Sequence, residues 1–183
     1  MNTTFPFPNN TELYGTDIRI GVEKLTVSHL PLLESFTCGN EVIDDFFKTQ
    51  AADSIREVTY LFIYLNHNRI AAAASLSCSS IPLTSFGSYV ESVPAVEITY
   101  FAVDTRYQKL HMEPDPAAGY FSDSILSHII GMIYDFTEKF CGASHVLLYS
   151  TAAACHFYER NQFREINEDY YMIRQSHFLE GRG

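Results

Sequence analysis

The chain has 183 residues, enough for one domain whose core buries most of its apolar surface. Hydrophobic residues make up 46% and aromatic residues 14%, which is typical of a packed globular domain and excludes a disordered chain. The formal net charge of −10 argues against nucleic acid as a partner, because an acidic surface repels phosphate backbones and attracts cations. We therefore expect a single domain over residues 1–183, with an irregular segment at residues 1–15.

The N-terminus lacks the basic region and apolar run of a secretory signal, and no stretch reaches the roughly 18 apolar residues that span a bilayer. The cysteines show neither metal-ligand spacing nor a Cys-x-x-Cys motif; they are Cys38, Cys78, Cys141 and Cys155. We therefore expect reduced thiols, no metal site, no membrane association and a cytoplasmic location.

The first half of the chain predicts a strand, a helix and a hairpin. Residues 18–27 are rich in β-branched side chains and predict the strand. The runs 59–65 and 69–77 flank turn residues and predict the hairpin. Asn40 can cap a helix between these two parts, whose apolar positions recur at intervals of three and four, at Ile43, Phe46, Phe47, Ala51 and Ile55.

The second half continues with a loop, a buried strand and a helix. Residues 79–94 predict a long loop because prolines and glycine interrupt the run at Pro82, Gly87 and Pro94. The apolar run 95–103 predicts a buried strand. A long helix follows, whose apolar face consists of Ile125, Leu126, Ile129, Ile130, Ile133, Phe136 and Phe140.

A short strand at 145–149, a helix that ends at Arg160 and a strand at 170–174 complete the chain. The resulting order, β-α-β-β-β-α-β-α-β, predicts an α/β fold with a mixed β-sheet of about six to seven strands and helices on both faces. A buried strand that leads into a helix N-terminus is a common anion site, because the first amide groups of the helix lack partners within it. The stretch from Glu97 to the long helix therefore suggests a phosphate-bearing ligand.

Three motifs occur in order between Phe36 and Phe163. The first spans residues 36–47, the second reads Glu-Ile-Thr-Tyr-Phe-Ala-Val-Asp-Thr-Arg-Tyr-Gln at 97–108, and the third is Phe-Tyr-Glu-Arg-Asn-Gln-Phe at 157–163. Together they resemble the GNAT superfamily of acetyl-CoA-dependent N-acetyltransferases. The first is similar to the first helix of its toxin-like branch. The second resembles its fourth strand and pyrophosphate loop, and the third its late Phe-Tyr-x-x-x-Gly-Phe motif.

The resemblance implies a GNAT-like fold and transfer of an acetyl group from acetyl-CoA to a primary amine by direct attack. Glu97, the carboxylate in the strand 95–103, matches the general base of histone-type members. Tyr158 matches the tyrosine that protonates the departing thiolate. Both side chains also have a structural interpretation, in which Glu97 faces water and Tyr158 is a core aromatic residue.

The resemblance also implies a set of cofactor contacts. The pantetheine arm would pair with the main chain of Phe101, Ala102 and Val103. The phosphates would be bound by Arg106, Gln108, Lys109, Ser122 and Asp123, although Asp123 also suits a helix start on dipole grounds alone. After Gln108 the family usually continues Gly-x-Gly-x-Gly/Ala, whereas the loop 109–121 of this chain is longer and poor in glycine.

Three functions stay open on these observations. The first is an N-acetyltransferase whose acceptor is a small cationic amine or a basic peptide, in keeping with the net charge of −10. The second is a non-catalytic GNAT-fold binding module with an impaired pyrophosphate loop. The third is a toxin that acetylates aminoacyl-tRNA, which the 12 Lys and Arg against 22 Asp and Glu disfavour. The oligomeric state is open, a homodimer included.

Overall fold

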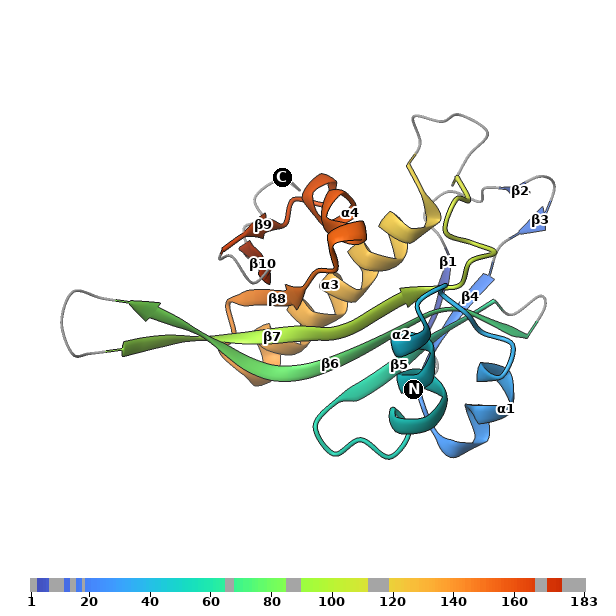
Figure 1. The fold of residues 1–183 in the computed structure, drawn as a ribbon, viewed down its shortest axis with the longest axis horizontal. Coiled ribbons are helices and arrows are strands. Elements are labelled where there is room, and N and C mark those ends of the chain that lie inside the picture. Colours follow the sequence, from blue (N-terminus) through green and yellow to red (C-terminus); the bar gives the residue numbers. More distant parts are fainter. Residues whose placement is uncertain are drawn as a thin grey trace. The chain divides into compact units, whose positions relative to one another are not determined.

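The computed structural model describes residues 3–6, 12–13, 16–17, 19–64, 68–84, 90–111, 119–166 and 171–175. Figure 1 shows the described helices and strands, coloured along the sequence. The chain divides into two compact units, and each is considered separately. Unit 1 comprises Met1–Ser75 and Tyr100–Leu126, and unit 2 comprises Leu76–Thr99 and Ser127–Gly183. The two longest strands and the longest helix each contribute residues to both units, so the division does not follow a linker in the sequence.

The strands of unit 1 follow the hydrogen-bonding order β1 (Thr3–Pro6), β4 (Arg19–Lys24), β5 (Val58–Tyr64) and β6 (Arg69–Thr84). The pairs β1–β4 and β4–β5 are antiparallel. The short strands β2 (Glu12–Leu13) and β3 (Thr16–Asp17) form a separate two-stranded ribbon. The expected strand at 18–27 and the hairpin strands are confirmed, whereas β1 and β2 lie where an irregular segment is expected.

Unit 1 contains short helical segments: a 3-10 turn (Val27–His29), α1 (Leu30–Leu33), α2 (Glu41–Asp45) and a π-helix (Phe46–Gln50). The predicted cap is confirmed, since the Asn40 side chain accepts hydrogen bonds from the amides of Val42 and Ile43. The buried core joins these helices to the sheet through Leu25, Leu33, Phe36, Phe46, Phe47, Leu61, Ile63, Ile70 and Ala102.

The prediction that Ile55 belongs to this buried face is wrong, because its side chain is 100% exposed. The amide of Ala51 donates to the carbonyl of Phe46, five residues earlier, at 2.9 Å. This wide π turn ends the helix at Gln50, one turn before Ile55, so the interval of four from Ala51 no longer describes a helical face.

Unit 2 contains the ends of two long strands, β6 and β7 (Val90–Val103), followed in hydrogen-bonding order by β8 (His145–Tyr149), β10 (Tyr171–Gln175) and β9 (Arg164–Glu165). β7 and β8 are parallel, and β8, β10 and β9 are antiparallel. The mixed sheet is therefore confirmed, and the described strands make it eight-stranded, since β1 and β9 join its edges.

The long loop predicted at residues 79–94 is wrong. β6 continues to Thr84 and β7 begins at Val90, and Gly87 lies outside the described residues. Proline has a φ near −65°, which an extended chain tolerates at the loss of one amide donor. The carbonyl of Pro94 still accepts a hydrogen bond from the amide of Ser144 at 3.3 Å, so the proline interrupts one bond and not the strand.

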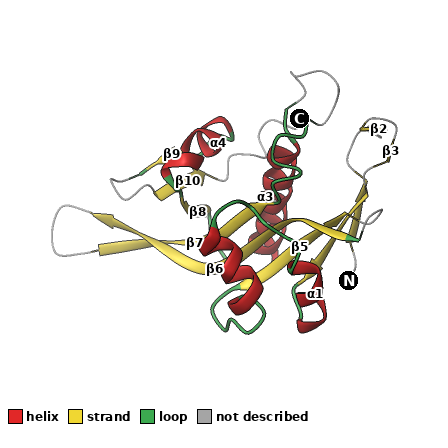
Figure 2. Ribbon diagram, turned by 45° about the vertical axis from the view of Figure 1, so that its right-hand side comes forward, coloured by secondary structure: helices red, strands yellow, loops and turns green. Residues whose placement is uncertain are grey.

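The long helix is confirmed as α3 (Phe121–Phe140), drawn in red in Figure 2. Its face is buried at Ile125, Leu126, Ile129, Ile130 and Ile133. Phe136 and Phe140 were expected on that face but are 48% and 75% exposed, because the buried face continues from Ile133 to Thr137, which is 8% exposed, and ends there. Among the described residues, no helix combines the length and hydrophobicity that crossing a bilayer requires.

Candidate functional site

The residues with predicted roles divide between the two units. Unit 1 contains all those expected to bind the cofactor, on the end of β7, on the turn after it and on the first turn of α3. Unit 2 contains Glu97 on β7 and Tyr158 on α4 (Cys155–Arg160). We describe each group within its own unit.

A turn over residues 105–109 follows β7, and the described chain resumes at Gly119, shortly before α3. The chain leaves the strand at Val103 and turns through Thr105–Lys109, with the amide of Tyr107 bonded to the carbonyl of Asp104 at 2.8 Å. The amide of Phe121, the first residue of α3, donates to the carbonyl of Leu110 at 2.8 Å. The structure therefore brings the turn and the start of α3 together, as a strand-turn-helix anion site requires.

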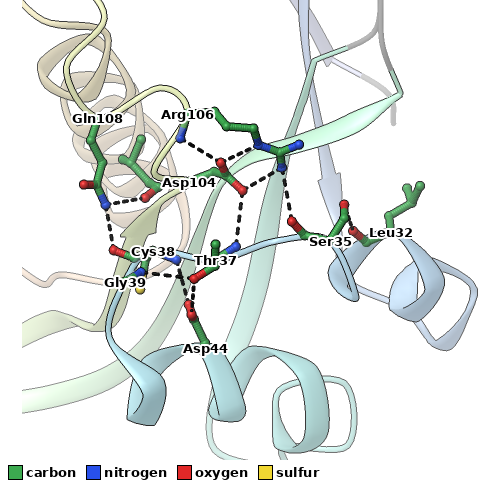
Figure 3. A network of polar contacts seen from close by, with 10 residues as sticks. Leu32, Ser35, Thr37, Cys38, Gly39, Asp44, Asp104, Arg106 and Gln108 are labelled. Atoms are coloured by element: carbon green, nitrogen blue, oxygen red, sulfur yellow. Dashed lines mark hydrogen bonds and ion pairs between the residues drawn. The ribbon is translucent and has the colours of Figure 1, made fainter.

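Asp104 is the centre of this turn and is 0% exposed (Figure 3). Its Oδ1 accepts from the amide and Nε of Arg106 at 2.9 and 2.7 Å. Its Oδ2 accepts from Nη2 of Arg106 at 2.7 Å and from the amide of Thr37 at 3.2 Å. Both carboxylate oxygens therefore accept two hydrogen bonds each, which satisfies a buried charge.

These bonds decide the ionisation of the pair. Burial alone would raise the pKa of Asp104, but the hydrogen bonds from the side chain and amide of Arg106 and from the amide of Thr37 lower it below its ordinary value. The hydrogen bond between the side chains of Asp104 and Arg106 also raises the pKa of Arg106. The pair is thus ionised throughout the neutral range, and it occupies Nε and Nη2 of the guanidinium that the sequence assigns to phosphate.

Gln108 also makes contacts within the protein. Its Nε2 donates to the carbonyl of Cys38 at 2.7 Å and to that of Val103 at 2.9 Å. The amide of Thr105 donates to the carbonyl of Thr37 at 2.8 Å. The turn after β7 is therefore fastened to residues 35–39, the segment that precedes α2 (Figure 3).

Asp44 of α2 holds the same segment from the other side. It accepts from the hydroxyl of Thr37 at 2.6 Å and from the amide of Cys38 at 2.8 Å. Burial opposes ionisation of Asp44, but these hydrogen bonds lower its pKa. Burial, followed by the contact with Asp44, raises the pKa of the Cys38 thiol to about 11. Sequence analysis missed Thr37, Asp44 and Asp104. A signal was available for Asp104, which is an aspartate directly after a buried strand.

The remaining cofactor candidates lie in different environments. Lys109 is exposed on the turn, and Ser122 is buried in the first turn of α3. Asp123 accepts from the amide of Tyr120 at 3.1 Å, while its own amide donates to the carbonyl of Tyr120 at 3.0 Å. This reciprocal pair caps α3 and fits the helix-start interpretation of Asp123.

The end of β7 is closely packed. Ala102 and Val103 are 4% and 6% exposed, and Phe101 is half-buried. Within unit 2, the parallel register of β7 with β8 runs from Ala95↔His145 to Ile98↔Leu148. β7 then continues past the last of these pairs to Val103. The expectation that the main chain of Phe101, Ala102 and Val103 contacts a pantetheine arm stays a prediction.

Glu97 is half-buried in unit 2, opposite Leu147 of β8. Among the residues that the structure describes, no ion pair holds its carboxylate. Two residues along the strand, the hydroxyl of Thr99 lies 3.1 Å from that of Ser77 on β6. The partial burial of Glu97 therefore does not decide between a general base and a side chain that faces water.

Tyr158 is 7% exposed and lies among aromatic rings. The ring centroids of Phe157 and Phe163 lie 5.0 and 5.8 Å from its own, both in edge-to-face geometry. No hydrogen bond to its hydroxyl occurs within the described ranges, and burial raises its pKa above the ordinary value. The side chain therefore stays protonated at neutral and mildly alkaline pH.

The turn after α4 explains how the third motif folds. The amide of Phe163 donates to the carbonyl of Tyr158 at 3.0 Å. Gln162 adopts a φ of 68°, in the left-handed region that glycine adopts most easily. The resembling motif has glycine at this position. The chain therefore forms the turn with glutamine, for which this backbone conformation is less favourable.

No group of three or more His, Cys, Asp or Glu side chains is placed to bind a metal in the part of the chain that the structure describes. No protein-family model and no curated protein sequence matches the chain.

Solved structures do match. AtaTR bound with AcCoA shares 16% identity over 90% of this chain and 98% of that one, with a TM-score of 0.74. KacT, solved as a variant with one tyrosine replaced by phenylalanine, shares 17% identity over 88% and 98%, with a TM-score of 0.71. AtaT complexed with acetyl-methionyl-tRNAfMet shares 16% identity over 88% and 97%, with a TM-score of 0.69. These toxins have the GNAT fold, so the predicted fold is confirmed.

Proposed function

We propose that this protein, whose fold is that of the AtaT and KacT toxins, is an acetyl-CoA-dependent N-acetyltransferase. The observation that carries the proposal is the strand-turn-helix arrangement of residues 101–111 and 119–123, in which the sequence motif forms the strand and turn, and the carbonyl of Leu110 accepts from the first amide of α3. That a structure of similar fold was solved with AcCoA supports this choice of ligand.

In the proposed complex, the main chain of Phe101, Ala102 and Val103 pairs with the pantetheine arm. The pyrophosphate lies at the Ser122 end of α3, where the helix dipole favours an anion, although the amides of Phe121 and Asp123 already donate to the carbonyls of Leu110 and Tyr120. Lys109 adds a cation from the turn. Arg106 and Gln108 are held by Asp104 and by main-chain carbonyls, so a phosphate contact from either would compete with those bonds.

The proposed reaction is direct transfer. The amine nitrogen attacks the thioester carbonyl carbon, a C–N bond forms, and the C–S bond breaks to release the coenzyme A thiolate. Glu97 accepts the proton of the amine, directly or through water. Tyr158 donates its proton to the thiolate. Because burial raises the pKa of Tyr158, the phenol carries its proton across the neutral range but is a weaker acid than a free tyrosine.

The net charge of −10 favours a cationic acceptor, such as a polyamine, an aminoglycoside-like compound or a basic peptide. Encounter with such an acceptor weakens as salt rises, because exposed charges are screened over roughly 8 Å at physiological ionic strength.

A second acceptor class is favoured by a different observation. AtaT was solved with acetyl-methionyl-tRNAfMet, which makes aminoacyl-tRNA the alternative substrate. Recognition of tRNA requires cations that contact phosphates, and 12 Lys and Arg against 22 Asp and Glu leave few for this purpose. On this balance of charge we rank the small amine first.

The test is an acceptor screen with acetyl-CoA in which mass spectrometry detects the acetylated product. The screen covers polyamines, aminoglycosides, basic peptides, amino acids and charged tRNA, each at low and at high salt. A cationic amine acetylated faster at low salt supports the first ranking. Transfer to charged tRNA above all small amines establishes the second. No transfer to any acceptor, with coenzyme A binding intact, identifies a binding module.

A further inference from the structure

The turn after β7 contains two polar side chains that the family resemblance assigns to phosphate, yet Nε and Nη2 of Arg106 and Nε2 of Gln108 already donate to groups within the protein. Arg106 directs Nε and Nη2 at Asp104, at 2.7 Å each. Gln108 directs Nε2 at the carbonyls of Cys38 and Val103. Of the charged and amide side chains on this turn, Lys109 alone has no such contact among the described residues.

The partner of these side chains is the segment 35–39 (Figure 3). Four hydrogen bonds connect it to the turn: the amide of Thr37 to Asp104, the amide of Thr105 to the carbonyl of Thr37, Nη2 of Arg106 to the carbonyl of Ser35, and Nε2 of Gln108 to the carbonyl of Cys38.

Two carboxylates clamp this segment. Asp104 holds Thr37 from the side of β7, and Asp44 holds Thr37 and Cys38 from α2. Gly39 adopts a φ of 85°, a left-handed conformation that favours glycine, and this allows the segment to turn beside Thr105. The shape of the turn is therefore stabilised by segment 35–39, which is distant in the sequence, and not by glycines within the turn.

We propose that Asp104 is a positioning residue for coenzyme A, which fixes the turn against segment 35–39, and that Arg106 and Gln108 act through this clamp and not on phosphate. The inference rests on the proposed function, because it concerns the cofactor site of that function. It replaces the expected roles of two residues and leaves Lys109 as the side chain of the turn that contacts phosphate.

Calorimetry with coenzyme A at low and high salt separates positioning from direct contact. Lys109→Ala is expected to weaken binding and to make it less dependent on salt, since one cation is lost. Gln108→Met, which removes the two amide donations and keeps the local charge, is expected to weaken binding about tenfold while leaving the dependence on salt at its wild-type value. Asp104→Asn is expected to weaken binding although it removes a negative charge, a change that would strengthen binding if Arg106 contacted phosphate directly. Arg106→Lys, which keeps the charge but loses the bidentate geometry, is expected to fall between the wild type and Asp104→Asn.

Cys38 reports on the clamp without any cofactor. Its thiol is half-buried, whereas that of Cys78 is exposed and serves as the internal control. Alkylation followed by peptide mapping is expected to modify Cys38 faster in Asp104→Asn and Gln108→Met than in the wild type, with Cys78 unchanged. Gln108→Met alters an exposed side chain without adding charge and keeps the test valid where Asp104→Asn does not fold.

Two results overturn the inference. One is wild-type affinity for coenzyme A in both Asp104→Asn and Gln108→Met; the other is a loss of salt dependence in Arg106→Ala equal to that in Lys109→Ala. If the wild type itself fails to bind coenzyme A, the proposed function is wrong, and the rate of Cys38 alkylation then decides on the clamp alone.

Discussion

Asp104 and Tyr158 are both buried ionisable side chains, and burial has opposite outcomes at the two positions. Hydrogen bonds from Arg106 and Thr37 outweigh burial at Asp104, so its pKa falls and the charge is kept. Aromatic rings surround Tyr158 in place of donors, so burial prevails, its pKa rises and the proton is kept. Burial alone therefore does not fix ionisation, and the partners decide whether a site has a fixed charge or a retained proton.

The largest effect is expected on the unfolding free energy when Asp104, which carries the fixed charge, is replaced. Asp104→Ala leaves the guanidinium of Arg106 and the amide of Thr37 without their acceptor, and we expect a loss of about 3 kcal/mol of unfolding free energy. Urea denaturation measures this loss. Asp53→Ala, at an exposed aspartate, is the control and is expected to change stability by less than about 0.5 kcal/mol. Equal effects of the two substitutions would contradict the structural role of Asp104.

The second effect is expected on kcat when Tyr158, which retains its proton, is replaced. Tyr158→Phe keeps the ring packing and removes the hydroxyl, so we expect an intact fold and a kcat lower by about 10²-fold, as for a lost general acid. Steady-state kinetics with chemistry shown to be rate-limiting measure it. Tyr60→Phe makes the same chemical change in unit 1 and is expected to leave kcat at its wild-type value. Unchanged turnover in Tyr158→Phe would make Tyr158 a core residue only.

The two sites also differ in how pH affects stability. The lowered pKa of Asp104 adds stability that is present above its unfolded pKa of about 3.9 and is lost as pH falls through the lower folded value. The raised pKa of Tyr158 adds stability that is present below about pH 10 and is lost above it.

Unfolding free energies from pH 2 to 11 check both directions. The advantage of the wild type over Asp104→Asn should shrink below about pH 4, and the wild type should lose stability relative to Tyr158→Phe above about pH 10. A constant difference across either window would show that the pKa of that group is not shifted.

The smallest effect concerns the turn that follows Tyr158. Gln162 has a φ of 68°, so Gln162→Gly removes strain and is expected to raise the unfolding free energy by up to about 1 kcal/mol. Thermal denaturation measures the gain. Gly131→Ala within α3 is a useful contrast, because nothing lies within 4 Å of an added Cβ there and helix propensity favours alanine. A destabilised Gln162→Gly would show that the Gln162 side chain contributes more than its backbone costs.

The sequence predicted the elements whose pattern is local. The face of α3 at Ile125–Ile133 and the cap at Asn40 follow from spacing and residue type alone. Ile55 and Phe140 follow the same spacing but lie beyond the packed part of each helix, which depends on the rest of the fold.

The candidate site was less predictable for the same reason. The motif at 97–108 indicated a cofactor site, which stays a prediction, but one hydrogen bond of Arg106 goes to Ser35 and one of Gln108 goes to Cys38, each about 70 positions earlier in the sequence. Pairwise contacts over such a separation leave no periodic signal in a single sequence. Similarly, Pro82 and Pro94 concealed the full length of β6 and β7, because proline usually indicates a loop but is tolerated by an extended chain.

Titration of the wild-type protein with coenzyme A in a calorimeter tests the central claim most directly. We expect saturable binding of one molecule per chain, which weakens as salt rises because the phosphates carry the charge. The protein should also show an increase in thermal stability, since the ligand binds only the folded state. Absence of both heat and stabilisation at millimolar coenzyme A would contradict the account of this protein as an acetyltransferase.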